Sequence, residues 1–338
     1  MELAARFNQQ TGSSYYLTAE APERVADYLH SIDYLNEGER VTRVTPAGEG
    51  NMNVTLRITT GRHSFILKQS RPWVAKYPEL KAPVDRILTE HHFSQAIAQD
   101  KFLRGRMPEV LRVDATNYVL LLEDLGEGGD LSSIYGSSGN MKDVHLKHLL
   151  QFVTKLHRLQ PANFPPNRAL KKLNHAHIFD LPFRPDNGFP LDAFQPGLAT
   201  IALPYQHDDR LRKMVTQLGK EYLATGSRLI HGDFYPGSFL TSAEGKVYVI
   251  DTEFAHLGRP EFDLGVLMAH LLLSGAEEGR ILQLDRDYDK PPGFSGRLSR
   301  QFCYVEIMRR LIGIAQLPLS LTLEERERLL DRARAGLT

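Results

Sequence analysis

The sequence has little cysteine and no excess of either charge. Cys303 is the only cysteine among 338 residues, so the chain cannot close an intramolecular disulfide, and we expect a reducing compartment. This residue lies in an apolar, helix-like pattern, which favours a buried thiol over a nucleophile. Lys and Arg number 41, as do Asp and Glu, and no long basic run occurs. We therefore expect no nucleic-acid partner.

Long hydrophobic runs are also absent. The longest apolar stretches, residues 119–122 and 266–273, are far shorter than the roughly 20 residues that cross a bilayer. The first sixteen residues lack the basic start and apolar run typical of a signal peptide. We expect a cytoplasmic protein with no membrane partner. With 42% hydrophobic and 24% charged residues the composition is that of a globular protein, and the length suggests two domains.

The apolar pattern changes along the chain from strand-like to helical. Residues 40–70 alternate in hydrophobicity as strands do. A Gly- and Ser-rich stretch at 126–140 is typical of a linker, and the apolar spacing beyond it is mostly helical. Prolines punctuate residues 161–196, where we expect irregular structure. We predict an α+β fold with a strand-rich N-terminal lobe over 1–125 and a mostly helical C-terminal lobe over 126–338.

A glycine-rich turn lies between the first strand-like segments. It reads GEGNMN and contains Gly48, Gly50 and Asn51. Glycines allow main-chain N–H groups to approach a phosphate closely, so this turn is a candidate cover for a nucleotide. On its own such a turn is weak evidence.

A lysine and a glutamate follow the turn in an order that strengthens this interpretation. Lys68 lies in the apolar segment SFILKQS, from which it can reach phosphate oxygens. Residues 82–99 are predicted to be helical and place Glu90 where it can pair with Lys68. A strand lysine held by a helix glutamate positions ATP phosphates in kinases. Taken singly, each residue could be an ordinary surface charge.

Two aspartates follow strand-like segments in the C-terminal half. Asp233, in HGDFYPGS, can accept a hydrogen bond from an attacking hydroxyl. Asp251, eighteen residues later in VYVIDTEF, can bind Mg²⁺. The intervening AEGK favours a hairpin that brings both aspartates to adjacent loops. If the segment is extended, Glu253 points to the same side as Asp251, and both can share one cation. The alternative is that the aspartates only cap helices or form turns.

Together these motifs resemble the aminoglycoside and choline kinase superfamily. HGDFYPGS, VIDTEFA and FDLG carry the resemblance, which runs in order from about residue 45 to 315. GEGNMN, LKQSRPWV and EIMRRLIGIA are similar to one branch, the 5-methylthioribose kinases. Phe234 and Tyr235 stand where that branch usually has Leu and His, and Ser238 stands where most of the superfamily has Asn.

The resemblance implies a two-lobed protein-kinase-like fold that uses ATP and Mg²⁺. Adenine would be held by main-chain groups of Glu123 and Leu125 in LLEDL, at the position of a kinase hinge. Asp251, Glu253 and Ser238 would lie beside the metal. The N-terminal lobe would bind the nucleotide, and the C-terminal lobe would carry catalysis and the acceptor.

The acceptor implied by the resemblance is the hydroxyl of a small metabolite, in particular a sugar such as 5-methylthioribose. Arg309, Arg310 and Tyr235 would contact it. Adjacent residues on a helix point about 100° apart, so one arginine could instead bind a carboxylate, or both could be surface charges. Asp263 in FDLG would brace the catalytic loop.

Other functions remain open from the sequence. The acceptor could be an aminoglycoside, a choline-like alcohol or homoserine. A non-catalytic nucleotide-binding pseudokinase is a further alternative, although every expected catalytic carboxylate is present. The resemblance also suggests a homodimer.

Overall fold

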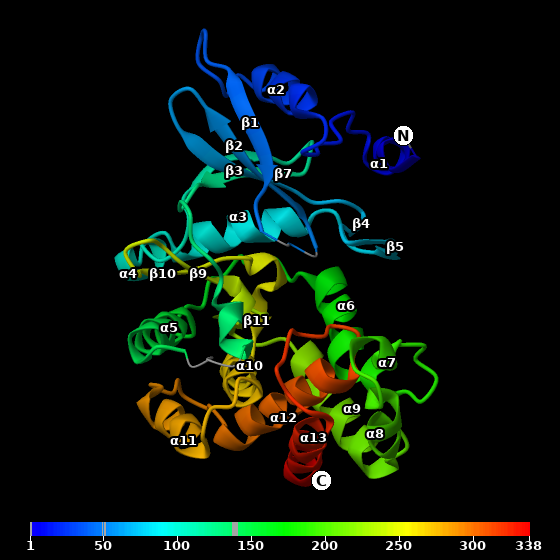
Figure 1. Cartoon of the computed structure of the whole chain (residues 1–338). Helices are drawn as coiled ribbons and strands as arrows, with labels where there is room; N and C mark the ends of the chain where they lie inside the picture. Colours follow the sequence, from blue (N-terminus) through cyan, green and yellow to red (C-terminus); the bar gives the residue numbers. More distant parts are fainter. Residues whose placement is uncertain (1, 49, 51, 137–140) are drawn as a thin grey trace. The chain divides into compact units, whose positions relative to one another are not determined.

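The computed structural model describes residues 2–48, 50, 52–136 and 141–338 (Figure 1). They form two compact units, Met1–Glu127 and Gly128–Thr338. The boundary lies in the Gly-rich stretch, two residues after the position predicted from the sequence.

The first unit is built on a five-stranded antiparallel sheet with strand order β1-β2-β3-β7-β6. Its strands are β1 (Val41–Pro46), β2 (Val54–Thr60), β3 (Ser64–Gln69), β6 (Val110–Asp114) and β7 (Val119–Glu123). A separate ribbon pairs β4 (Trp73–Val74) with β5 (Tyr77–Lys81). The helices are α1 (Glu2–Thr11), α2 (Pro22–Ser31), α3 (Arg86–Ile97) and α4 (Lys101–Arg104).

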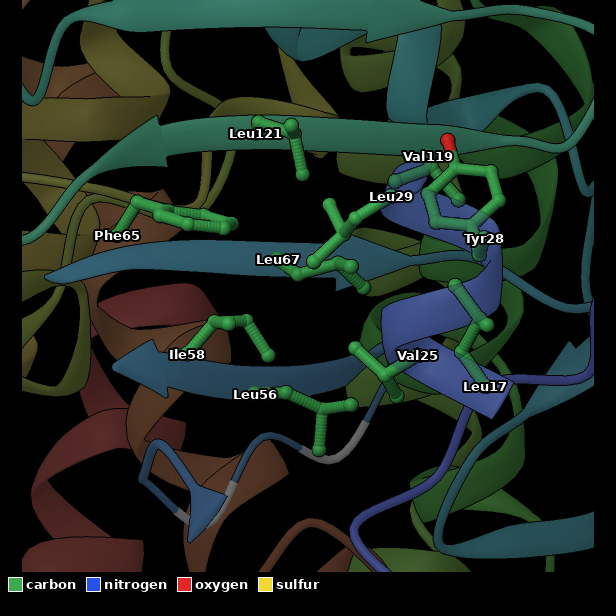
Figure 2. Close-up of a cluster of buried hydrophobic side chains, with 10 residues drawn as sticks. All are labelled: Leu17, Val25, Tyr28, Leu29, Leu56, Ile58, Phe65, Leu67, Val119 and Leu121. Atoms are coloured by element: carbon green, nitrogen blue, oxygen red, sulfur yellow. The ribbon is translucent and has the colours of Figure 1, made fainter. Parts of the chain in front are cut away.

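The two faces of this sheet carry different side chains, because successive strand residues point to opposite sides. Leu56 pairs with Leu67 across β2 and β3, and one such face forms an apolar core with α2 (Figure 2). The next pair in register, Thr55 with Lys68, therefore points to the other face. Figure 1 shows α2 and α3 on opposite sides of the sheet. The fold thus directs Lys68 toward α3.

The second unit is mostly helical and is centred on α10 (Pro260–Leu273), of which every residue is buried. It packs against α12 (Gly296–Ile312). The two helices approach closely at Gly265, where a Cβ atom would lie 2.5 Å from the carbonyl oxygen of Ser299. The other α-helices are α5 (Asp143–Leu156), α6 (Arg168–Phe179), α7 (Leu191–Phe194), α8 (Leu198–Gln206), α9 (Asp209–Leu223), α11 (Glu278–Asp287) and α13 (Leu323–Leu337).

Short strand pairs and single turns of 3₁₀ helix carry the loops of the second unit. The AEGK turn joins β9 (Phe239–Thr241) to β10 (Val247–Val249) in the predicted hairpin. β8 (Arg228–Ile230) pairs with β11 (His256–Gly258). The 3₁₀ turns are η1 (Leu131–Tyr135), η2 (Leu181–Phe183), η3 (Pro236–Ser238) and η4 (Thr252–Phe254).

The prediction that residues 161–196 are irregular was wrong in part. Helix α6 lies within them and buries Leu170, Asn174 and Ile178, which are spaced four residues apart. Prolines flank this helix but do not enter it, and their density obscured the helical period in the sequence. Among the residues that the structure describes, no helix is long and apolar enough to span a membrane.

Candidate active site

Lys68 and Glu90 form a buried ion pair in the first unit. The Nζ atom of Lys68 lies 2.6 Å from Oε1 of Glu90, and the two side chains are 5% and 7% exposed. The pairing predicted from the sequence is therefore present. Removing one partner of such a pair leaves a buried charge, which is strongly destabilising.

Arg86, which the sequence analysis did not single out, fastens α3 to the surrounding loops. It lies one turn before Glu90 and is 1% exposed. Its guanidinium donates to the carbonyl oxygens of Arg71 at 2.6 Å, Pro83 at 2.7 Å and Met52 at 2.6 Å. Because Met52 belongs to the glycine-rich turn GEGNMN, this arginine links the helix that carries Glu90 to that turn.

In the glycine-rich turn, Gly48 has a φ of 79°, a left-handed conformation that favours glycine. At Gly50 a Cβ atom would come within 3.3 Å of the carbonyl oxygen of Asn53. Both glycines line a cavity of ≈ 510 Å³ within the first unit. Asn51, predicted to contact the nucleotide, lies outside the described residues.

The segment predicted to hold adenine begins at the end of β7. The main-chain N–H of Glu123 donates to the carbonyl oxygen of Glu109 at 2.9 Å. In any main-chain hydrogen bond with adenine, Glu123 would therefore accept through its carbonyl oxygen. Leu125, two residues on, is half-buried.

In the second unit Asp263 holds the loop that contains Asp233. Its two carboxylate oxygens accept from the main-chain N–H groups of His231 at 2.7 Å and Gly232 at 2.9 Å. Nε2 of His157 lies 3.1 Å from the same carboxylate. Burial alone would raise the pKa of Asp263, but the hydrogen bond and charge of His157 and the N–H of His231 hold it below its usual range. The predicted bracing role is confirmed.

Asp233 itself is partly open, with a side chain that is 20% exposed. Burial raises its pKa to about 6, against the opposing charges of Arg309 and Arg310. A carboxylate with such a pKa is suited to general-base work near neutral pH. Oγ of Ser238 donates to the main-chain carbonyl of Asp233 at 2.9 Å, which closes the loop on itself.

The two residues that follow Asp233 lie in different surroundings. Phe234 is fully buried and packs against Phe152 and Phe239. Phe234 stands where the 5-methylthioribose kinases usually have Leu, and this difference therefore affects packing in the core. Tyr235 instead lies under a guanidinium, with its ring centre 4.8 Å from Cζ of Arg310.

Asp251 and Glu253 do not lie on an extended segment, so the geometric reason given for a shared cation was wrong. Asp251 adopts a left-handed conformation with φ 61°, and Thr252–Phe254 form the 3₁₀ turn η4. Asn167 fixes this turn by donating to the carbonyl oxygens of Glu253 at 2.7 Å and Ala255 at 3.0 Å.

The donor set of this loop fits Mg²⁺. The charge of Asp251 acts on Asp233, so a carboxylate lies near the candidate base. Mg²⁺ prefers oxygen ligands and is usually held by one or two carboxylates together with waters and phosphates. No group of three or more His, Cys, Asp or Glu side chains that could hold a metal occurs in the described parts of the chain. A magnesium site of this kind would need only the two carboxylates.

Arg309 and Arg310 are buried, so the interpretation of both as surface charges was wrong. They are 8% and 5% exposed and converge on Glu306, which lies one turn earlier on α12. Nη1 of Arg309 lies 3.1 Å from both oxygens of Glu306, and Nε of Arg310 lies 2.6 Å from Oε1. Nη2 of Arg310 also lies 3.8 Å from Oδ1 of Asp233.

Glu306 is the residue that the sequence analysis missed at this site, although it opens the quoted motif EIMRRLIGIA. Burial alone would raise its pKa, but Arg309, Arg310 and a hydrogen bond from His270 hold it well below the usual range. The spacing of a glutamate three and four residues before two arginines is the available sequence signal.

Comparison with known proteins agrees with this arrangement. Residues 43–299 match the model of the phosphotransferase enzyme family, and the chain belongs to that family. It is 27% identical over 275 residues to a methylthioribose kinase from Erwinia tasmaniensis, a match that covers 77% of this chain and 67% of that enzyme. A methylthioribose kinase from Bacillus cereus is 28% identical over 240 residues, or 67% of this chain and 59% of that enzyme.

Solved structures confirm the α+β, protein-kinase-like fold. A choline kinase from Streptococcus pneumoniae matches with a TM-score of 0.55 and 14% identity over 94% of this chain and 99% of the other. A spectinomycin phosphotransferase, in complex with ADP and spectinomycin, matches with a TM-score of 0.52 and 12% identity over 93% and 97%. Family and relatives together confirm the predicted class of enzyme, a small-molecule kinase, and this class implies use of a nucleotide.

Proposed function

We propose that the protein transfers the γ-phosphoryl group of ATP, with Mg²⁺, to a hydroxyl of a small uncharged sugar, in particular 5-methylthioribose. Two observations support this acceptor. The relatives described above are methylthioribose kinases. The candidate base Asp233 also lies beside two buried arginines.

Asp233 is proposed to orient the acceptor hydroxyl and take its proton as the new oxygen–phosphorus bond forms. Its pKa of about 6 leaves it mostly ionised at pH 7 and still basic enough to accept that proton. Phosphoryl transfer depends mainly on positioning and charge stabilisation. The hydrogen bonds from His231 and Gly232 to Asp263 supply the rigid loop that positioning requires.

The nucleotide is proposed to bind through groups of the first unit. Lys68, held by Glu90, would engage phosphate oxygens. Main-chain groups around Gly48, Gly50 and Asn51 would cover the phosphates. Glu123 and Leu125 would contact adenine through main-chain atoms.

Asp251 and Glu253 are proposed to hold Mg²⁺, with the hydroxyl oxygen of Ser238 nearby. When bound, Mg²⁺ offsets the negative charge of the phosphates. The chain's own contribution is to hold the main chain at Glu253, whose carbonyl oxygen accepts a hydrogen bond from Asn167.

The arginines favour an uncharged acceptor over a cationic one. Arg310 contacts both Asp233 and the ring of Tyr235, and Arg309 lies beside it on α12. Two guanidinium groups near the base disfavour an aminoglycoside or a choline-like cation, whereas they can donate to sugar hydroxyls. We propose that Arg309, Arg310 and Tyr235 contact the acceptor.

The experiment that tests this function is Mg²⁺-dependent release of ADP from ATP in the presence of candidate acceptors. 5-Methylthioribose is compared with other sugars, homoserine, choline and aminoglycosides, with Asp233→Ala as the control. We expect turnover on 5-methylthioribose and a loss of at least about a hundredfold in Asp233→Ala, since the variant lacks the base.

Other outcomes discriminate among the alternatives. Turnover only on a cationic acceptor would refute the electrostatic argument and leave the kinase chemistry intact. Nucleotide binding without turnover on any acceptor would favour the pseudokinase. Near-normal turnover by folded Asp233→Ala would show that Asp233 is not the base.

We also propose that the protein is a cytoplasmic homodimer. The family resemblance supports the dimer, and light scattering on the purified chain would test it. Cys303 is a buried free thiol, which is compatible with a reducing compartment.

A further inference from the structure

A network of buried polar groups runs from Arg310 through Glu306 and His270 to Tyr135. Oε1 of Glu306 accepts from Arg310 and also lies 3.2 Å from Nε2 of His270. Nδ1 of His270 lies 2.5 Å from the hydroxyl of Tyr135. Glu306 and His270 are at most 1% exposed, and Tyr135 is 2% exposed. These groups come from η1, α10 and α12, which are distant in sequence.

The donor and the acceptor in each hydrogen bond of this network can be assigned. Glu306 is ionised, because its pKa is held well below the usual range, so its carboxylate can only accept. His270 must therefore donate through Nε2. Burial lowers the pKa of His270 to about 4, so the ring is neutral near pH 7 and its Nδ1 must accept from the hydroxyl of Tyr135. The ionised Glu306 thus determines which nitrogen of His270 carries the proton, and this in turn makes the hydroxyl of Tyr135 the donor.

We propose that His270 is a positioning residue of the phosphoryl-transfer site. Together with Tyr135 it fixes the carboxylate of Glu306, and Glu306 holds the guanidinium of Arg310 against Asp233 and Tyr235. This inference rests on the proposed function, in which Arg310 contacts the acceptor. A buried polar network is rigid only when every member is satisfied, so loss of the His270 donor would release Arg310.

Two substitutions at His270 separate positioning from simple packing. His270→Gln keeps an N–H donor close to the place of Nε2, whereas His270→Leu fills similar volume without a donor. For the acceptor, we expect kcat/KM to fall about tenfold in His270→Leu and to stay within about twofold of wild type in His270→Gln. The KM for ATP should be unchanged, since none of these residues is among those proposed to bind the nucleotide. Equal losses in both variants, or no loss in His270→Leu, would overturn the inference.

A double-mutant cycle tests whether His270 acts through Arg310. In an Arg310→Met background, His270→Leu should change kcat/KM by less than about twofold, because the group that it positions is already absent. A second tenfold loss would show that His270 acts independently of Arg310 and would refute the proposal. Should His270→Leu fail to fold, the same cycle is run with Tyr135→Phe.

Tyr205→Phe is a matched control for Tyr135→Phe. Tyr205 is also a buried tyrosine, and its hydroxyl donates to the exposed carboxylate of Asp331 at 2.8 Å, but it belongs to the contact between α8 and α13. We expect it to lower the melting temperature to a similar extent and to leave kcat/KM unchanged. Equal loss of activity in the two variants would assign the Tyr135 effect to stability alone.

A readout without turnover distinguishes failure of this inference from failure of the proposed function. In ¹⁵N-labelled protein at pH 7 we expect the His270 signals of a neutral ring protonated at Nε2, and a slowly exchanging Nε–H of Arg310. The arginine signal should persist in His270→Gln and broaden in His270→Leu. If these results are obtained but no sugar is phosphorylated, the proposed acceptor fails and the positioning stands. A wild-type ring protonated at Nδ1 would refute the positioning whatever the acceptor.

Discussion

Gly232 shows at the scale of one residue why the catalytic loop needs its particular sequence. Its φ is 83°, a conformation that glycine adopts without steric cost. A Cβ atom there would lie 2.3 Å from the carbonyl oxygen of Phe254, which belongs to the η4 turn. Gly232 thus allows the loop of Asp233 and the loop of Asp251 to pass close to each other.

We expect Gly232→Ala to disrupt the site, because the new methyl group would push the two loops apart. The free energy of unfolding should fall by at least about 2 kcal/mol, and kcat should fall about a hundredfold or more. Urea denaturation and initial rates measure the two effects.

Gly245→Ala is a control that has the cost of a positive φ but not the steric clash expected in Gly232→Ala. Gly245 has a φ of 77°, but a Cβ atom there meets nothing within 4 Å. That variant should lose about 1 kcal/mol of stability and keep its activity. If the two alanine variants lose equal stability, the close approach to Phe254 does not matter.

Residue-scale features of this protein could be predicted only where the motif is local. Asp233, Asp251 and the Lys68–Glu90 pair follow from short patterns whose order along the chain is informative. The partners of Arg309 and Arg310 could not be predicted in the same way. Glu306 is close in sequence, but burial of all three depends on how α12 packs on α10, and no local pattern encodes that packing.

At the scale of elements, α6 shows what the prolines concealed. The segment was expected to be irregular, but it is a helix with one buried face that supports both catalytic segments. Asn167, just before it, holds the η4 turn, and Asn174 donates to the hydroxyl of Tyr222 at 3.1 Å and to the carbonyl oxygen of Gly232 at 3.5 Å. By contrast, β1, β2 and β3 lie in the stretch 40–70, where apolar alternation predicted strands, and α3 lies within the helix predicted over 82–99.

Asn167→Gly tests the link between α6 and the η4 turn. Asn167 has a φ of 45°, which glycine tolerates, so the substitution removes the side-chain bonds without straining the backbone. Loss of two hydrogen bonds should lower the free energy of unfolding by about 1–3 kcal/mol. The concentration of Mg²⁺ needed for half-maximal turnover should also rise, because Glu253 is less well held.

Asp33→Gly is the control for this prediction. Asp33 is an exposed residue of the first unit with a φ of 51°, so the same kind of replacement there should preserve or raise stability. An unchanged Mg²⁺ requirement in Asn167→Gly would show that the η4 turn does not depend on α6.

At the scale of the whole molecule, buried titratable groups make stability depend on pH. Burial lowers the pKa of His256 and of His270 to about 4, from an ordinary value of 6.5. Between pH 6.5 and 4 the unfolded chain therefore binds more protons than the folded protein, and the free energy of unfolding falls as pH falls. Asp233 acts in the opposite direction, because burial raises its pKa to about 6 from 3.8.

We therefore expect the protein to lose stability on acidification from pH 6.5 to 4, since two histidines outweigh one aspartate. Each histidine contributes a loss of about 3 kcal/mol over this interval, and Asp233 offsets about one such loss. Urea denaturation at pH 7, 5.5 and 4.5 measures the trend. It should be steeper in Asp233→Asn, which lacks the opposing group, and flatter in His256→Gln, which lacks one histidine. A wild-type stability that is constant or rises toward pH 4.5 would mean that these histidines are protonated in the folded protein.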